Sequence, residues 1–73
     1  MTKAEELSNL KSCLNRARLD EVIFVLIGRD AAAPDTIRFW TQKRISLGKN
    51  NVNDPQIKEA LDCANKIESK LSE

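Results

Sequence analysis

An uninterrupted apolar run at residues 22–27 is the feature that most constrains how this chain folds. β-Branched and aromatic residues dominate the run, which favours a β-strand over residues 21–28. The absence of polar alternation predicts that both faces of this strand are buried. A short apolar run also suits a helix, so a competing interpretation extends an N-terminal helix through Phe24.

A single strand has a direct consequence for association. Its backbone N–H and C=O groups have no partner within the chain, and unpaired backbone groups in a buried site are energetically costly. The simplest remedy is a second copy, whose residues 22–27 pair with those of the first across a two-fold axis. We therefore predict a homodimer.

The N-terminal segment is predicted to form the first of three helices. Thr2 followed by Glu5 is typical of a capping box, and it predicts a helix over residues 3–17. Its apolar residues share one side, with Cys13 at the edge: Leu7, Leu10, Leu14 and Ala17.

The second and third helices have similar start signals. Asp30 is predicted to cap a helix that has Pro34 in its first turn and runs to Leu47, and Gly48 then suits a left-handed C-terminal cap. Asp54 caps the last helix, with proline following it. That helix carries one apolar stripe: Ile57, Ala60, Leu61, Ala64, Ile67 and Leu71.

The two later helices, joined by a short turn, are expected to form an antiparallel hairpin. Residues 1–73 then make one domain, mostly α with one short β-strand in the order α-β-α-α, in which the strand pairs across a homodimer. The alternative fold class is an all-α three-helix bundle.

Composition narrows the ways in which so small a core is stabilised. The 73 residues include no histidine and only two cysteines, Cys13 and Cys63, too few for a disulfide framework or a zinc site. No metal or cofactor is predicted, and self-association is the remaining way to stabilise the core.

The formal net charge of +1 shows no general affinity for nucleic acid. Without a recognisable signal peptide or an apolar run long enough to span a bilayer, we expect a cytoplasmic protein with no membrane association.

The residue types argue against an enzyme. With no histidine and no tyrosine, the chain lacks the commonest bases and proton donors. Both cysteines lie on or beside apolar stripes, where a thiol is an inert small hydrophobe. Asp30 and Asp54 are explained as helix caps.

A short pattern resembles one found in small uncharacterised phage and prophage proteins. It consists of an apolar run ending at Ile27, then Asp30, Ala33-Pro34 and Trp40, with a closing helix similar to residues 60–64. The resemblance covers residues 22–68. It implies a phage or prophage accessory role, and with the small size it suggests the hypothesis of action on a host or defence system. The family has no established activity, so no catalytic residues are implied.

The second helix carries the candidate partner-binding surface. Phe39 falls opposite the apolar arc of this helix, and aromatic and arginine residues are preferred at interface hot spots. We predict protein–protein binding through Arg38, Phe39, Gln42 and Lys43. In the alternative interpretation, Phe39 is simply part of the core of a dimer.

Two further hypotheses concern basic residues. Arg44 falls inside the apolar arc, where it either extends past the apolar surface to water or pairs with an acid across a subunit interface. The alternative function is a nucleic-acid-binding module, with contacts from Arg29, Arg38, Lys43 and Lys49. A third class of function, a small-ligand enzyme or a protein that sequesters a small ligand, requires a pocket at a subunit interface.

Overall fold

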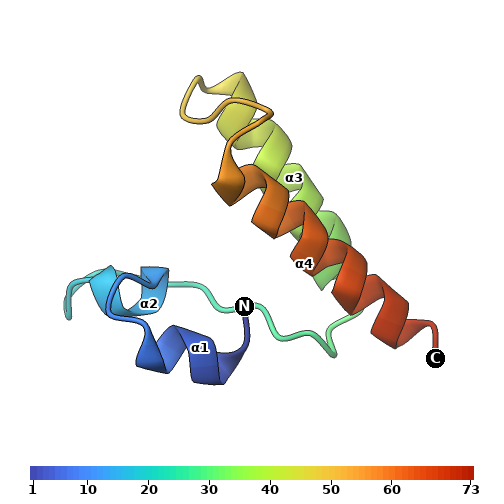
Figure 1. The fold of residues 1–73 in the computed structure, drawn as a ribbon, viewed down its shortest axis with the longest axis horizontal. Helices are drawn as coiled ribbons and strands as arrows, with labels where there is room; N and C mark the ends of the chain where they lie inside the picture. The colour runs from blue at the N-terminus through green and yellow to red at the C-terminus, as the bar shows by residue number, and fades with distance from the viewer.

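The computed structural model describes residues 1–73 and contains four α-helices and no β-strand. Two short helices, α1 (Lys3–Ser8) and α2 (Cys13–Arg16), occupy the N-terminal part of the chain. Two long ones, α3 (Ala33–Ser46) and α4 (Pro55–Leu71), lie side by side as an antiparallel hairpin (Figure 1). The predicted hairpin is thereby confirmed, and the mostly helical class with it.

Small residues line the contact between α3 and α4. Buried residues of the hairpin come from facing turns of the two helices: Ala33, Pro34, Thr41, Ile57, Ala60 and Ala64. Ile57 is the only large side chain that is fully buried. Alanines allow the helix axes to approach closely, but they contribute little apolar area to a core. The hairpin is therefore tightly packed along a narrow line.

The end of α3 follows the sequence-based expectation closely. Gly48 has a φ of 72°, and its amide donates to the carbonyl of Ile45 over 3.0 Å. The amide of Lys49 donates to the carbonyl of Arg44, also over 3.0 Å. These two bonds form a Schellman motif, in which a left-handed residue lets the chain satisfy the last carbonyls of a helix.

The expected N-terminal helix over residues 3–17 is interrupted, which corrects that prediction. Thr2 does cap α1, because its Oγ1 accepts the amide of Glu5 over 3.2 Å. Ser12 then bonds back to the carbonyl of Glu6 and caps α2 by accepting the amide of Asn15. Serine and asparagine side chains compete in this way with helical hydrogen bonding, and here they end one helix and begin the next.

Asn15 holds this helical turn together with one amide group. Its Nδ2 lies 2.8–3.2 Å from the carbonyls of Glu6, Leu7 and Asn9. A side-chain amide has two hydrogens, so one of them is shared between two of these acceptors. The three leucines of the predicted apolar side, Leu7, Leu10 and Leu14, remain exposed.

Residues 21–28 form neither the predicted strand nor a continuation of a helix. They run as an irregular connector from α2 to α3 (Figure 1). The physical reason is that a strand requires a second strand to satisfy its backbone hydrogen bonds, and no other segment of this chain is extended. The all-helical alternative therefore fits the structure, with α1 and α2 packed on each other but not packed on α3 or α4.

Replacing Gly48 tests the left-handed cap. No atom lies within 4 Å of a Cβ added to Gly48, so Gly48→Ala causes no clash and costs only the strain of a left-handed alanine, about 1–2 kcal/mol. Chemical denaturation followed by circular dichroism measures this loss. Gly28→Ala is the control, because its Cβ meets Ile67 at an ordinary 3.5 Å, and we expect little change. Equal losses at both glycines would contradict this account.

Candidate functional site

The outer face of α3 presents an aromatic side chain to solvent. Phe39 is 66% exposed, and Gln42 and Lys43 are exposed on the following turn. Thr41, on the opposite side of the helix, is buried against α4. We call Phe39, Gln42 and Lys43 the α3 outer face. Helical periodicity placed Phe39 outward in the sequence, and it lies there in the single chain.

Arg38, predicted beside these residues as a partner contact, is engaged within the chain. Its two terminal nitrogens donate to the two carboxylate oxygens of Glu68 over 2.8 and 3.1 Å. Further bonds reach Asn65 over 3.0 Å and Asp35 over 3.3 Å. A planar guanidinium suits this bidentate geometry. Arg38 therefore fastens α3 to α4 and borders the α3 outer face.

The contact between Arg38 and Glu68 shifts the pKa values of both residues. The hydrogen bonds from Arg38 lower the pKa of Glu68, and its positive charge adds to the effect. The hydrogen bond to Glu68 in turn raises the pKa of Arg38. Thirty residues separate the two in the chain, and their meeting depends on the register of the hairpin, which no local sequence signal reveals.

Arg44, the candidate for an ion pair across an interface, has an amide as its partner in the single chain. Its Nε donates to Asn50 Oδ1 over 2.7 Å, and its guanidinium carbon lies 5.7 Å from the centre of the Trp40 ring. The stacking over an aromatic face is a favourable cation–π arrangement. The interfacial ion pair stays a prediction.

Asn50 connects Arg44 to the start of α4 and corrects the role expected for Asp54. Asn50 Nδ2 donates to Asp54 Oδ2 over 3.0 Å, and the Asn51 amide donates to the same oxygen over 2.9 Å. The Asp54 carboxylate thus turns back onto the loop and makes no capping bond to α4. These bonds, the Asn51 amide first, lower the pKa of Asp54.

Asp30 also departs from the capping role predicted for it. Its Oδ1 accepts the amide of Ala32 over 2.9 Å, in the turn that precedes the helix. Ala32 itself occupies the N-cap position of α3, without a side-chain bond. Asp30 therefore shapes the entry to the helix, and Pro34 lies in the first turn as expected.

The basic residues proposed for nucleic-acid contact lie apart. Arg29 precedes α3 and Lys49 follows it, so a helix of 14 residues, about 21 Å long, stands between them. Arg38 is neutralised by Glu68. Lys43 is exposed near the C-terminal end of the same helix. The structure does not gather the four into one patch.

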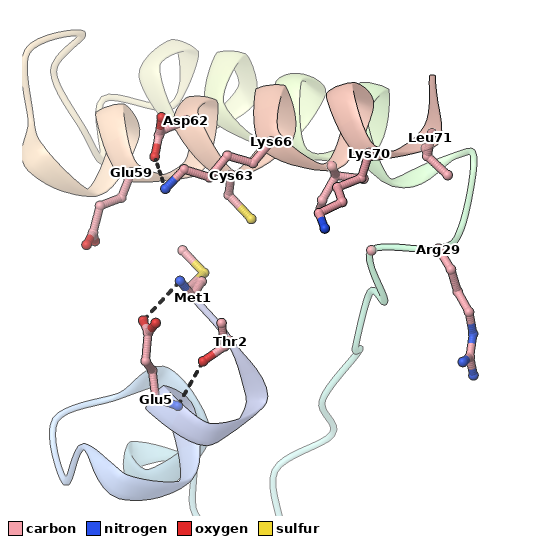
Figure 2. Close-up of a pocket in the computed structure, with 12 residues that line it drawn as sticks. Met1, Thr2, Glu5, Arg29, Glu59, Asp62, Cys63, Lys66, Lys70 and Leu71 are labelled. Atoms are coloured by element: carbon pink, nitrogen blue, oxygen red, sulfur yellow. Dashed lines mark hydrogen bonds and ion pairs between the residues drawn. The ribbon is translucent and has the colours of Figure 1, made fainter. Parts of the chain in front are cut away.

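An open cleft of about 760 Å³ separates α1 from α4. Figure 2 shows Met1 and Glu5 on one side of it, facing Asp62, Cys63 and Lys66 on the other. Several of its charges are already paired across short distances. The N-terminal ammonium lies 3.1 Å from Glu5, and Lys66 Nζ lies 3.0 Å from Asp62 Oδ2.

Those pairs account for the pKa shifts within the cleft. The hydrogen bond to the N-terminal ammonium lowers the pKa of Glu5, and the hydrogen bond to Asp62 raises the pKa of Lys66. Cys63 is half-buried at the wall, whereas Cys13 is exposed on α2, which differs from the apolar setting predicted for it. No group of three or more cysteine, aspartate or glutamate side chains is placed to hold a metal ion.

Comparisons with protein-family models, curated proteins and solved structures found no match to this chain. None of the four helices has the length and apolar character needed to cross a membrane.

The Arg38–Glu68 contact predicts how the stability of the hairpin depends on pH. Glu68 has a pKa below its ordinary value of 4.5, so its ion pair stabilises the fold above that pH and is lost as pH falls through the lowered pKa. Glu68→Gln should therefore lower the melting temperature of the hairpin at pH 7, and the difference from wild type should vanish in acid.

The matched control is Glu59→Gln, which changes an exposed glutamate of α4 that forms no ion pair. We expect it to leave the melting temperature at pH 7 near that of wild type. Thermal denaturation followed by ellipticity between pH 2 and pH 7 makes the comparison. A Glu68→Gln difference that stays constant over this range would show that the ion pair does not stabilise the hairpin.

Proposed function

We propose that this chain acts by binding another protein and not by catalysis. The observation that supports this is the amount of surface it leaves open. Its accessible area is 6242 Å², whereas a compact monomer of 8.2 kDa is expected to have about 4,500 Å². Sixteen large apolar side chains are exposed. So large an apolar exposure marks an interaction surface.

The α3 outer face is the surface we assign to the partner protein. Phe39 offers a rigid aromatic side chain, and its neighbours Gln42 and Lys43 offer polar contacts around it. A buried aromatic surrounded by polar contacts is the usual composition of an interface hot spot. The fitting partner has an apolar pocket with an acidic rim, opposite Lys43. Because Arg38 is held by Glu68, α3 presents this surface on a fixed support.

The biological setting of this proposal follows from a sequence pattern and from the cysteines. The resemblance of residues 22–68 to small phage and prophage proteins supports an accessory role, acting on a host or defence system. Cys13 and Cys63 are both free thiols, which suits the reducing cytoplasm.

Partner capture tests the α3 outer face. The full chain, immobilised and exposed to bacterial lysate, should retain a specific protein that Phe39→Ala no longer retains, because the aromatic anchor is gone. Val52→Ala is the control, since Val52 is comparably exposed at 62% but lies in the loop between α3 and α4. Quantitative mass spectrometry compares the three captures. An unchanged capture by Phe39→Ala would refute the assignment, and a collapsed melting transition would mark Phe39 as core.

The alternative function, nucleic-acid binding, makes a different prediction, which an electrophoretic mobility-shift assay can check. Binding through Arg29, Arg38, Lys43 and Lys49 requires an affinity for DNA that falls steeply with salt. The separation of Arg29 from Lys49 and the engagement of Arg38 lead us to expect no retardation of duplex or single-stranded DNA, even at low salt. Retardation that is lost in Lys43→Glu and Lys49→Glu would favour the nucleic-acid function instead.

A further inference from the structure

The connector between α2 and α3 contains a strand-forming segment without a partner. We call residues 22–26 the open segment. None of its amides or carbonyls takes part in a hydrogen bond within the chain. Four of its five side chains are also left in water, with Val22 99% and Phe24 84% exposed, and only Leu26 is half-buried. Such a segment carries both the backbone groups and the side chains that a neighbouring strand would cover.

Hydrogen-bonded turns mark both ends of the open segment. Before it, the amide of Glu21 donates to the carbonyl of Arg18, and the Glu21 carboxylate accepts the Arg18 amide over 2.7 Å. After it, the amide of Asp30 donates to the carbonyl of Ile27 over 2.9 Å. The chain between these turns has the length of an average β-strand. Its β-branched and aromatic residues favour that conformation.

We infer that the open segment pairs with the open segment of a second copy of this chain, as two antiparallel strands across a two-fold axis. No other part of the chain supplies a strand, because the rest consists of helices and polar turns. The proposal concerns a different surface from the α3 outer face. It stands or falls independently of the partner protein assigned to Phe39.

Charge at the two ends of the segment favours the antiparallel arrangement. Acidic residues precede the segment and Arg29 follows it, with no charge between them. A two-fold axis between antiparallel strands requires one residue to face its own copy. When Val25 lies opposite Val25 of the second copy, Glu21 lies opposite Arg29. This register pairs opposite charges twice in the dimer, whereas parallel strands in register place Arg29 opposite Arg29.

Arg29 is also available for this pairing, because it takes part in no ion pair within the chain. Glu21 lies 3.4 Å from Arg18, but both side chains are exposed. An exposed ion pair of this kind contributes little, so Arg29 of the second copy can replace it.

The open surface has the size that a stable dimer requires. The accessible area exceeds that of a compact monomer by about 1,700 Å² per chain. Permanent dimers bury about 1,000–2,500 Å² per partner. A two-stranded sheet alone is marginal in water and requires apolar cover. Exposed leucines on the same part of the chain can supply that cover: Leu7, Leu10, Leu14 and Leu19.

Light scattering after size-exclusion chromatography tests the dimer with a matched pair of variants. Val25 and Val52 are similarly exposed, at 66% and 62%, so lysine at either position leaves the single chain undisturbed. The wild type and Val52→Lys should have twice the mass of 8.2 kDa in reducing buffer. Val25→Lys should weaken the dimer about a hundredfold or more and give the monomer mass, because the charge enters the interface. Ellipticity checks that the hairpin persists in all three.

A charge exchange tests the orientation of the strands. Arg29→Glu should weaken the dimer by roughly tenfold, because carboxylates then face each other at both ends. Adding Glu21→Arg should restore the affinity to within about threefold of wild type. A parallel pair would show no such rescue.

Two results would overturn the inference. One is a wild-type chain that remains monomeric at the highest concentration that stays in solution. The other is a dimer that Val25→Lys and Val52→Lys affect equally, which would place the interface elsewhere. Neither result bears on the α3 outer face, whose test is partner capture by Phe39. A monomer that still captures its partner would refute only the strand pairing.

Discussion

The contact between α3 and α4 is the constraint on which the rest of the structure depends. Ile57 and the buried alanines give it close packing, and the bidentate bond between Arg38 and Glu68 fixes how the two helices lie against each other. The loop between them adds a second polar link, from Arg44 through Asn50 to Asp54. Because the hairpin is held from within, its outer face and the connector before it are left free for other contacts.

The balance of apolar surface explains why association is central to this chain. The hairpin buries one large side chain completely, and many others remain in water. A radius of gyration of 12.9 Å exceeds the value of about 11 Å expected for a compact chain of this length. A single copy thus leaves unused much of the hydrophobic stabilisation that its sequence offers. A second copy and a partner protein would each bury part of it.

Local sequence signals predicted some of this structure and missed the rest for identifiable reasons. The left-handed Gly48 and the exposed Phe39 follow from the geometry of a single helix, and both were predictable. The interruption of the first helix depends on Ser12 and Asn15, whose side chains suit either a helix surface or a cap. The Arg38 contact depends on helix pairing across thirty residues. The strand at residues 21–28 was inferred from composition, but composition cannot provide the neighbour that a strand requires.

The open cleft between the N-terminal helices and the hairpin has a consequence for cooperativity. The α1–α2 unit is held chiefly by the hydrogen bonds of Asn15 and Ser12, and it does not pack on α3 or α4. We therefore expect the two parts of a single copy to unfold in separate transitions, with the smaller part opening first. A single free energy of unfolding would not describe such a chain. Pairing of the connector would join the two transitions into one.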